Sequence, residues 1–449
     1  MKLSQWLRQH SGSPQREISQ DYFSSDSTEF AKIATKQQRS LNSVAMRLCV
    51  ITQFFPPDFA ATGQLLDELV RHLSKQGVEI EVFTGQPGYA YKTASALAIE
   101  QVGSVRIRRS RASQLFSHQI RGKAINGVMF CIRSGLHLIR AFRKHNVFLI
   151  TTAPPFLPIL GYLANLIFGV SYVCLFYDLY PDIAVELGVV KHQHWIARFW
   201  RMVNRAVWRK ARGIIVLSPN MKQRIISHCP EVADKISVIH SWADPDWILP
   251  IAKQDNWFAQ KHNLVDCFTV LYSGNMGRCH DLDTILEAAQ HLQDAPVQFV
   301  CIGGGAQRKV VIEQAKKMGL KNFLFLPYQD KQVLPYSLSA CDLSLVSMDQ
   351  GMEDLVAPSK LYPAMSTGRP LAVICPRQSY LHQLIADANC GATFENQDSL
   401  GLANFIKFLM GDRQQAERMG ESGRHYLEAN FTPQEIARQY VEVLHQAMI

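Results

Sequence analysis

The sequence lacks several features that would define its class at once. It has 10 Cys in 449 residues, but no C-x-x-C pair and no Cys/His cluster at zinc-ligand spacing. Residues 1–45 are polar and lack the apolar core of a secretory signal. We therefore expect a cytoplasmic chain with reduced, mostly buried cysteines.

Acidic residues are scarce in one half of the chain. Residues 46–240 hold 24 basic and 11 acidic side chains, a net charge of +13, whereas residues 241–449 hold 17 basic and 23 acidic ones, a net charge of −6. This asymmetry predicts an anionic partner for the first half, either a nucleic acid or an anionic membrane surface.

The sequence also has no convincing membrane-spanning segment. Residues 153–177 include no charge and are numerous enough to cross a bilayer. However, Pro154, Pro155 and Pro158 crowd the start of this run and Gly169 divides it. A buried helix followed by a buried parallel strand explains the run better than a membrane span does.

The chain does contain two series of short apolar runs that alternate with segments of helical periodicity. The first series predicts strands at 47–52, 78–83, 147–151, 172–176 and 213–217, with helices at 63–76, 125–145, 156–168 and 195–211. The second predicts strands at 269–272, 298–302, 323–327, 343–346 and 371–374, with helices at 282–291, 306–318 and 360–367. Alternation of this kind predicts an α/β fold with two Rossmann-like domains.

The predicted domains are 46–240 and 241–449; the second includes a linker and terminal helices. Residues 1–45 are expected to form a flexible, dispensable extension, and Met46 is an alternative start.

The loop at 54–63 opens the first helix at the carboxyl end of the first strand, where open α/β sheets bind ligands. Free backbone N–H groups favour an anion there, with Gly63 as a candidate contact. The alternative is a plain loop with a helix cap at Thr62. The loop does not read G-x-G-x-x-G, so it does not indicate a nicotinamide cofactor.

Two carboxylates, Asp178 and Asp182, follow the strand at 172–176. Either can accept a proton from a hydroxyl nucleophile. The alternative is a helix cap plus a surface acid.

The second half has three loops at predicted strand ends or helix starts, and together they predict a phosphate ligand. Glycine permits close backbone approach, and Arg278 and Lys360 can neutralise a diphosphate. The other candidate contacts are Gly274, Asn275, Gly277, His280, Gly304 and Ser359. Two D-x-D pairs, at 244–246 and 281–283, lie in the linker and at a helix start, so we interpret both as structural and expect no metal site.

The predicted helix at 195–211 carries a basic stripe beside Trp and Phe residues. Basic amphipathic helices with Trp suit anionic membrane surfaces, and the basic segment at 106–111 adds to this charge. The alternative is a solvated helix face. The stripe consists of Arg198, Arg201, Arg205, Arg209 and Arg212.

Several motifs occur in the order found in one enzyme family. They are F-F-P-P…G-Q at 54–64, D-L-Y-P-D at 178–182, L-Y-S-G-N-M-G at 271–277, I-G-G-G at 302–305 and V-A-P-S-K-L-Y-P-A-M-S-T-G-R-P at 356–370. Over about residues 46–445 the chain resembles glycosyltransferase family 4, closest to the bacterial O-antigen and colanic-acid type.

The resemblance implies a GT-B fold with two Rossmann-like domains that face each other across a cleft. It also implies a nucleotide-sugar donor (a UDP- or GDP-sugar) on the second domain, a lipid-linked or polysaccharide acceptor on the first, and hexosyl transfer with retention and no essential metal or other cofactor. We expect a peripheral enzyme on the cytoplasmic face of the plasma membrane, with no nucleic-acid partner. A nucleotide-sugar 2-epimerase and a non-catalytic sugar- or membrane-binding homologue remain alternatives.

The chain departs from the family pattern at two places. Many members have G-R…K where this sequence has Asn275 and His280, which leaves Arg278 and Lys360 as the cations. The usual E-x7-E pair falls at Leu355 and Pro363, so the implied ribose contact is absent unless Glu353 or Asp354 replaces it.

Overall fold

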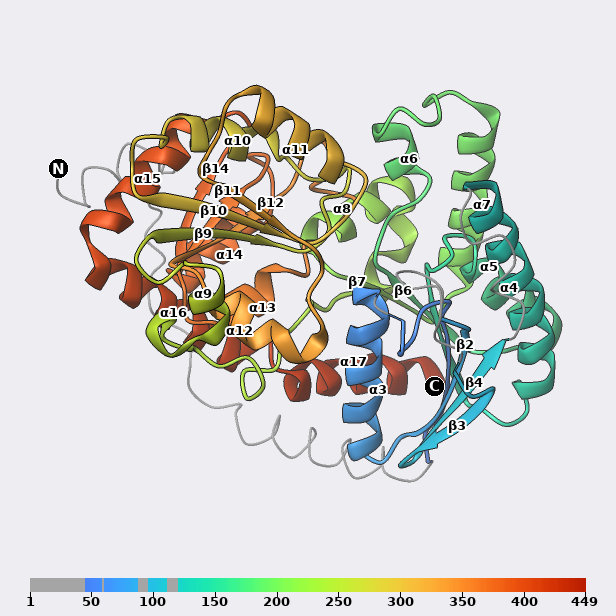
Figure 1. The fold of residues 1–449 in the computed structure, drawn as a ribbon. Coiled ribbons are helices and arrows are strands. Elements are labelled where there is room, and N and C mark those ends of the chain that lie inside the picture. The colour runs from blue at the N-terminus through green and yellow to red at the C-terminus, as the bar shows by residue number, and fades with distance from the viewer. Residues whose placement is uncertain (1–44, 59, 88–95, 111–119) are drawn as a thin grey trace, which may run out of the picture. The chain divides into compact units, whose positions relative to one another are not determined.

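The computed structural model describes residues 45–58, 60–87, 96–110 and 120–449. In the helix that begins at residue 120, the side chains are described only from residue 125 onward. Nearly all of the predicted extension at 1–45 therefore lies outside the described residues. Residues 46–449 form one compact unit that contains two β-sheets (Figure 1).

The first sheet has eight strands in the order β3-β4-β2-β1-β5-β6-β7-β8. All neighbours are parallel except β3 and β4, which form an antiparallel edge hairpin that periodicity did not predict. The strands are β1 (Arg47–Ile51), β2 (Glu79–Gly85), β3 (Ile99–Val102), β4 (Val105–Ser110), β5 (Val147–Thr151), β6 (Tyr172–Phe176), β7 (Gly213–Val216) and β8 (Ile236–Val238).

The second sheet has six parallel strands in the order β11-β10-β9-β12-β13-β14. Two parallel sheets confirm the predicted α/β class. The strands are β9 (Phe268–Ser273), β10 (Val297–Ile302), β11 (Phe323–Leu326), β12 (Leu343–Ser347), β13 (Leu371–Ile374) and β14 (Gly391–Phe394).

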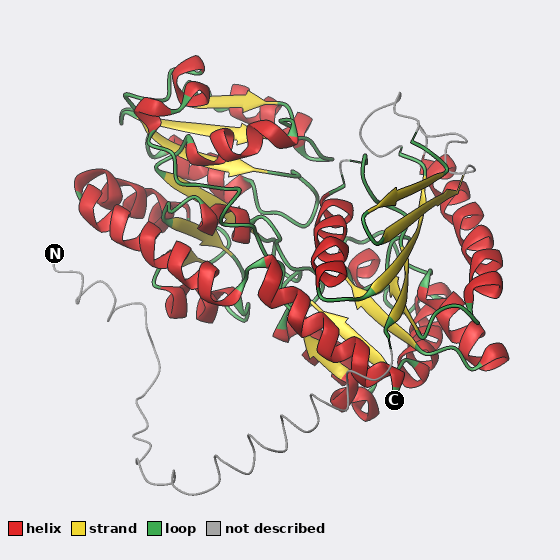
Figure 2. Ribbon diagram, turned by 90° about the horizontal axis from the view of Figure 1, so that it is seen from below, coloured by secondary structure: helices red, strands yellow, loops and turns green. Residues whose placement is uncertain are grey.

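Helices lie on both faces of each sheet, as expected for parallel strands joined by helical crossovers (Figure 2). Between residues 61 and 261 they are α3 (Ala61–Lys75), α4 (Ile120–Ala141), α5 (Pro158–Phe168), α6 (Asp182–Glu186), α7 (Trp195–Lys210), α8 (Pro219–His228) and α9 (Trp257–Lys261). The remainder are α10 (Asp283–Gln290), α11 (Arg308–Lys317), α12 (Leu334–Ser339), α13 (Leu361–Ser366), α14 (Leu381–Ala388), α15 (Ser399–Gly411), α16 (Arg413–Asn430) and α17 (Pro433–Met448).

The uncharged run at 153–177 folds as the sequence predicts, into α5 and then the fully buried strand β6. Gly161 of α5 lies directly on the sheet, because a Cβ there would come within 2.8 Å of the Tyr172 ring. Of the helices in the described residues, none has the length and hydropathy that crossing a membrane would require.

The last helix returns to the first sheet. Although α17 belongs to the segment 241–449, it packs against α3, β5, β6 and β7 (Figure 1). Its inner side carries Ile436, Tyr440, Val443 and Leu444, all buried, and Val443 lies over Gly213 of β7. The first sheet is therefore completed by residues from the far end of the chain.

Candidate active site

Two glycine loops meet beyond the carboxyl ends of the neighbouring strands β9 and β10. The Gly274 amide donates to Ile302 O (2.8 Å), and the Met276 amide donates to Gly304 O (2.6 Å). A Cβ on Gly303, whose φ is +140°, would lie 1.9 Å from Gly274 O. Only glycine permits this approach. The backbone of the two predicted phosphate loops is thereby fixed as a pair.

Lys360 immediately precedes α13, and its ammonium reaches the first of these loops. Its Nζ donates to Tyr272 Oη and lies 4.0 Å from the centre of the Tyr272 ring. Tyr272 Oη in turn donates to Asn275 O (2.9 Å). A Cβ on Gly274 would lie 3.5 Å from Lys360 Cε. The structure thus brings together Lys360, Gly274 and Asn275, which the sequence predicted from separate motifs.

Burial lowers the pKa of Lys360 to about 7. Removing an ammonium from water disfavours its charged form, and Lys360 has no carboxylate partner among the described residues to restore it. A phosphate placed beside Nζ would supply the missing negative charge. An anionic ligand would therefore stabilise the charged form of Lys360.

His280 cannot serve as a second cation. Its Nδ1 lies 2.8 Å from Ser347 O, an arrangement in which Nδ1–H donates and Nε2 keeps a lone pair. Burial, together with the nearby charge of Lys360, lowers its pKa to about 3. At neutral pH His280 can accept a hydrogen bond from a ligand hydroxyl but offers no charge to a phosphate.

The remaining predicted donor contacts surround the same loops. Asn275 and Arg278 are exposed, and Arg278 forms no ion pair with any described residue. Gly277 lies close to the Asn275 amide, and Ser359 is half-buried beside Lys360.

Arg308 is a basic residue at this site that the sequence interpretation missed. It begins α11, three residues after Gly305, and its buried Nε has no hydrogen-bond partner among the described residues. Burial raises the pKa of the Cys301 thiol to about 12, and the charges of Lys360 and Arg308 partly oppose that rise. Both cations therefore approach the end of β10. A basic residue closely following I-G-G-G was the available signal.

Asp178 comes from the first sheet but lies beside the second half of the chain. It pairs with Val356 in an isolated antiparallel bridge, in which the Leu179 amide donates to Leu355 O (3.1 Å). Burial raises the pKa of Asp178 to about 6. Its charge also adds to the effect of burial in raising the pKa of Cys279 to about 11, which places the carboxylate near the loop after β9.

Asp182 is engaged in a different way. Its carboxylate accepts from Arg201 Nε (3.0 Å), Arg224 Nε (3.0 Å) and His228 Nε2 (2.8 Å). Burial alone would raise its pKa, but the hydrogen bond from His228 and the neighbouring arginines lower it well below its usual value. This cluster joins α6, α7 and α8, so we assign Asp182 to the fold and no longer to catalysis.

The same cluster corrects the prediction for Arg201. Its side chain is only 15% exposed because it binds Asp182, so it cannot belong to a membrane-facing stripe. Arg209 is exposed but pairs with Glu231. Arg198 and Arg205 are exposed, as predicted for a basic face. In the predicted basic segment at 106–111, Arg109 is buried against Glu100 in the first sheet, and Arg111 lies outside the described residues.

Glu353 and Asp354 lie in the segment that leads to Lys360. Asp354 Oδ1 accepts from Asn220 Nδ2 (3.2 Å), so this carboxylate already has a partner. Glu353 Oε2 is buried and lacks a hydrogen-bond partner within the described part of the chain. Of the two residues, Glu353 has the free acceptor that a ligand hydroxyl requires.

Gly63 is the third residue of α3, where a Cβ would come within 3.1 Å of the Phe54 and Phe55 backbone. Thr62 lies inside the helix and does not cap it, so the alternative of a Thr62 cap is wrong; the preceding Ala60 provides no side-chain cap. The Gly63 amide donates to Ala60 O (2.9 Å) and so does the Gln64 amide (3.1 Å), so neither amide is free to bind an anion.

One residue of each D-x-D pair accepts a hydrogen bond from a nearby backbone amide. Asp281, which lies just before α10, accepts from the Thr284 amide (3.0 Å), and Asp244 Oδ1 accepts from the Asp246 amide (2.9 Å). Among the described residues, no group of three or more His, Cys, Asp or Glu side chains is arranged to hold a metal ion.

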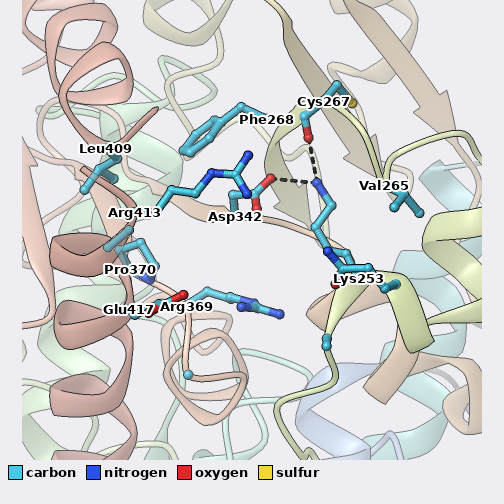
Figure 3. Close-up of a pocket in the computed structure, with 14 residues that line it drawn as sticks. Lys253, Val265, Cys267, Phe268, Asp342, Arg369, Pro370, Leu409, Arg413 and Glu417 are labelled. Carbon is cyan, nitrogen blue, oxygen red and sulfur yellow. Dashed lines mark hydrogen bonds and ion pairs between the residues drawn. The ribbon is translucent and has the colours of Figure 1, made fainter. Parts of the chain in front are cut away.

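A separate pocket lies at the amino ends of β9, β12 and β13, opposite the glycine loops (Figure 3). Its Lys253 ammonium is fully engaged by Asp342 (2.7 Å) and Cys267 O (2.6 Å). These contacts tie the linker to the sheet, and the pocket contains none of the predicted donor residues.

Comparison with known proteins identifies the family that this geometry fits. Residues 62–247 match the model of Glycosyltransferase Family 4, and residues 253–426 match that of Glycosyl transferases group 1. The chain belongs to this glycosyltransferase family. The two models meet near the predicted boundary between the halves, and both are described as glycosyltransferases, which favours transfer over the epimerase and non-catalytic alternatives.

Curated relatives of this glycosyltransferase agree. A probable glycosyltransferase, WbjE of Pseudomonas aeruginosa, is 22% identical over 80% of this chain and 88% of its own length. The putative colanic acid biosynthesis glycosyl transferase WcaI of Escherichia coli K12 is 24% identical over 76% of this chain and 86% of its own. The chain is thus a hexosyltransferase-type enzyme of glycan biosynthesis.

Solved structures establish its fold as GT-B. Sucrose-phosphate synthase from Thermosynechococcus elongatus superimposes with a TM-score of 0.69 at 17% identity, over 88% of this chain and 98% of that one. Anabaena HepE, solved in complex with UDP and glucose, gives a TM-score of 0.63 at 14% identity, over 89% and 99%. At these identities the likeness concerns the fold alone.

Proposed function

We propose that the protein is a retaining glycosyltransferase that moves a hexosyl group from a UDP- or GDP-sugar to a lipid-linked or polysaccharide acceptor. The observation that supports this best is the Lys360 ammonium, held without a carboxylate partner against the paired glycine loops. A diphosphate is the ligand whose negative charge suits a buried cation beside two glycine loops that permit close backbone approach. The UDP in the HepE complex is consistent with such a donor.

In this proposal the diphosphate lies along the loops at 274–277 and 303–305. Lys360, Arg278 and Arg308 stabilise the negative charge that develops on the leaving phosphate. Glu353, with its unpaired buried oxygen, accepts from a ribose hydroxyl and takes the role of the missing E-x7-E residue. His280 Nε2 accepts from a sugar hydroxyl.

The acceptor hydroxyl lies beside Asp178. The C1–O bond to the phosphate breaks first, and the acceptor oxygen then forms its bond to C1 on the same face, within an ion pair. The acceptor proton passes to the departing phosphate oxygen. Asp178 orients the hydroxyl through a hydrogen bond and forms no bond to the sugar.

A ligand screen followed by a product analysis tests the proposal. UDP- and GDP-sugars are compared for thermal stabilisation; a donor at 100 times its Kd adds about 2.7 kcal/mol to the free energy of unfolding. The anomeric configuration of the product is then read by NMR. An inverted product would contradict retention, and donor turnover that needs no acceptor would favour the epimerase.

Asp178→Asn should leave donor affinity unchanged and lower transfer by about 100-fold. Because the pKa of Asp178 is raised to about 6, its carboxylate is charged only above that pH. The parent's kcat/KM should therefore rise as pH increases through about 6, and the variant should lose this rise. The exposed Asp234→Asn is the matched control. Loss of nucleotide binding in the Asp178 variant would move this residue to the donor site.

Activity should survive chelation with EDTA. The leaving phosphate has protein cations in Lys360, Arg278 and Arg308, so it does not need a divalent ion. The measurement is the transfer rate of chelator-treated enzyme in metal-free buffer. Loss of activity that Mg²⁺ or Mn²⁺ restores would contradict this prediction.

The protein is further proposed to act as a peripheral enzyme on the cytoplasmic face of the plasma membrane, without a nucleic-acid partner. The net charge of +13 on residues 46–240 supports attraction to anionic lipid. The donor loops lie in the acidic half of the chain, which does not suit a nucleic acid.

A further inference from the structure

Three neighbouring helices of the first sheet expose an unusual amount of apolar surface. Of the 22 large hydrophobic side chains that are exposed among the described residues, 12 lie on α4, α5 and α7. Helix α5 packs against both α4 and α7, and the three lie side by side (Figure 1). Monomeric proteins rarely leave contiguous patches of this kind open to water.

On α4 the exposed residues form one stripe. Ile125, Val128, Ile132, Leu136 and Ile139 recur every three or four positions, and each is 48% to 54% exposed. The opposite side of the same helix is buried, where Phe130 stacks on Phe83 of the sheet. Helix α4 is thus apolar towards the core and also towards solvent.

The stripe continues on the two neighbouring helices. On α5 it comprises Leu163, Leu166 and Ile167, on a helix that has no charged residue. On α7 it comprises Trp195, Ile196, Phe199 and Met202. We call these twelve residues the three-helix face.

The charges that the three helices themselves carry have a single sign. None of the three helices includes Asp or Glu, and the sequence has no acidic residue between Glu100 and Asp178 or between Glu186 and Glu231. Exposed Arg140 on α4 and Arg198 and Arg205 on α7 lie on the same helices. Long basic side chains of this kind can extend to phosphate headgroups while their neighbours are buried in the acyl boundary.

We propose that the three-helix face is the surface by which this enzyme enters the interface of an anionic lipid bilayer. This proposal rests on the peripheral membrane association proposed above and assigns it to particular side chains. A second copy of the chain would bring the same unpaired positive charges together, which disfavours a dimer through this face. In this proposal, membrane binding depends mainly on the insertion of apolar residues. The sequence instead predicted membrane binding through the arginine stripe of α7.

Flotation with lipid vesicles tests the assignment. The parent should bind phosphatidylcholine vesicles that contain phosphatidylglycerol, and part of this binding should persist at high salt, because the apolar contribution is not screened. The variant Ile132→Gln/Leu136→Gln/Leu166→Gln should reduce the partition coefficient by about 100-fold or more. Arg198→Gln/Arg205→Gln should reduce it by about tenfold and remove most of its salt dependence.

The matched control is Val310→Gln/Leu400→Gln, which removes exposed apolar residues outside the face and should bind like the parent. Thermal stabilisation by UDP, measured without lipid, shows whether each variant is folded and binds donor; failure of the donor site is thereby distinguished from failure of the membrane surface. The proposal is overturned if the apolar variant floats like the parent or if the parent does not bind the anionic vesicles. It is also overturned if the face instead mediates self-association or binds an acidic protein in the absence of lipid binding.

Discussion

Replacing Lys360 by methionine is expected to lower kcat/KM for sugar transfer by about 100-fold while leaving the enzyme folded. Methionine keeps most of the side-chain volume but removes the ammonium that lies on the Tyr272 ring and reaches the Asn275 carbonyl. The loss should appear in donor binding and in turnover, because the charge on the phosphate increases as the sugar departs. Steady-state kinetics with the preferred donor and a UDP or GDP titration provide the measurement.

The control for this experiment is Lys309→Met, a lysine on α11 that is exposed and outside the paired loops. It should retain parental kinetics. An unchanged kcat/KM in a folded Lys360→Met enzyme would remove Lys360 from the donor site.

The pH profile gives an independent test of Lys360. Since burial lowers the pKa of Lys360 to about 7, its ammonium is present below that pH and is lost above it in the free enzyme. Donor kcat/KM should therefore fall as pH rises through about 7, and a bound diphosphate should shift the fall to higher pH. The methionine variant should lack this limb of the profile.

Asp182→Asn is expected to destabilise the fold by about 3 to 5 kcal/mol. The substitution keeps the shape of the side chain but leaves Arg201, Arg224 and His228 without the carboxylate that they share. Asp182 is only 6% exposed, so the cationic groups that contact it are shielded from water. Leaving such groups without a negative partner is costly. Urea unfolding, followed by far-UV circular dichroism, measures the change.

The control is Glu231→Gln, which removes the exposed pair with Arg209 and should cost less than about 1 kcal/mol. The Asp182 contribution should also depend on pH. Its folded pKa is depressed, so the stabilisation is present above the usual pKa near 3.8 and disappears as pH falls through the lower folded value. An Asp182→Asn enzyme that is as stable as the parent but slower would restore the catalytic interpretation.

Sequence periodicity located most of the strands and helices because parallel sheets are made of short apolar runs separated by amphipathic helices. It also identified the glycine loops and Lys360, since each lies beside a strand end or a helix start. It could not detect the β3–β4 hairpin, whose exposed edge strand Ile99–Val102 lacks a sustained apolar run.

The errors in the candidate site have a common physical cause. Asp178 and Asp182 look equivalent in the sequence D-L-Y-P-D, but their partners come from residues far along the chain. Asp182 binds residues 19, 42 and 46 positions away, whereas Asp178 lies beside the segment around Val356. The helical spacing of Arg201 likewise shows that it shares a face with Arg205, but it does not show that a buried carboxylate covers that part of the helix.

The position of α17 determines when the first sheet can be completed during synthesis. The strand β8 ends at Val238, yet the helix that covers β5, β6 and β7 begins only at Pro433. At typical elongation rates of about 5 to 20 residues per second, the ribosome needs roughly 10 to 40 s to bridge that interval. The first sheet must remain partly uncovered for this time, so the nascent chain presents apolar strands to chaperones until its last residues emerge. A premature stop near the 3′ end of the message would for the same reason damage the half of the protein that was made first.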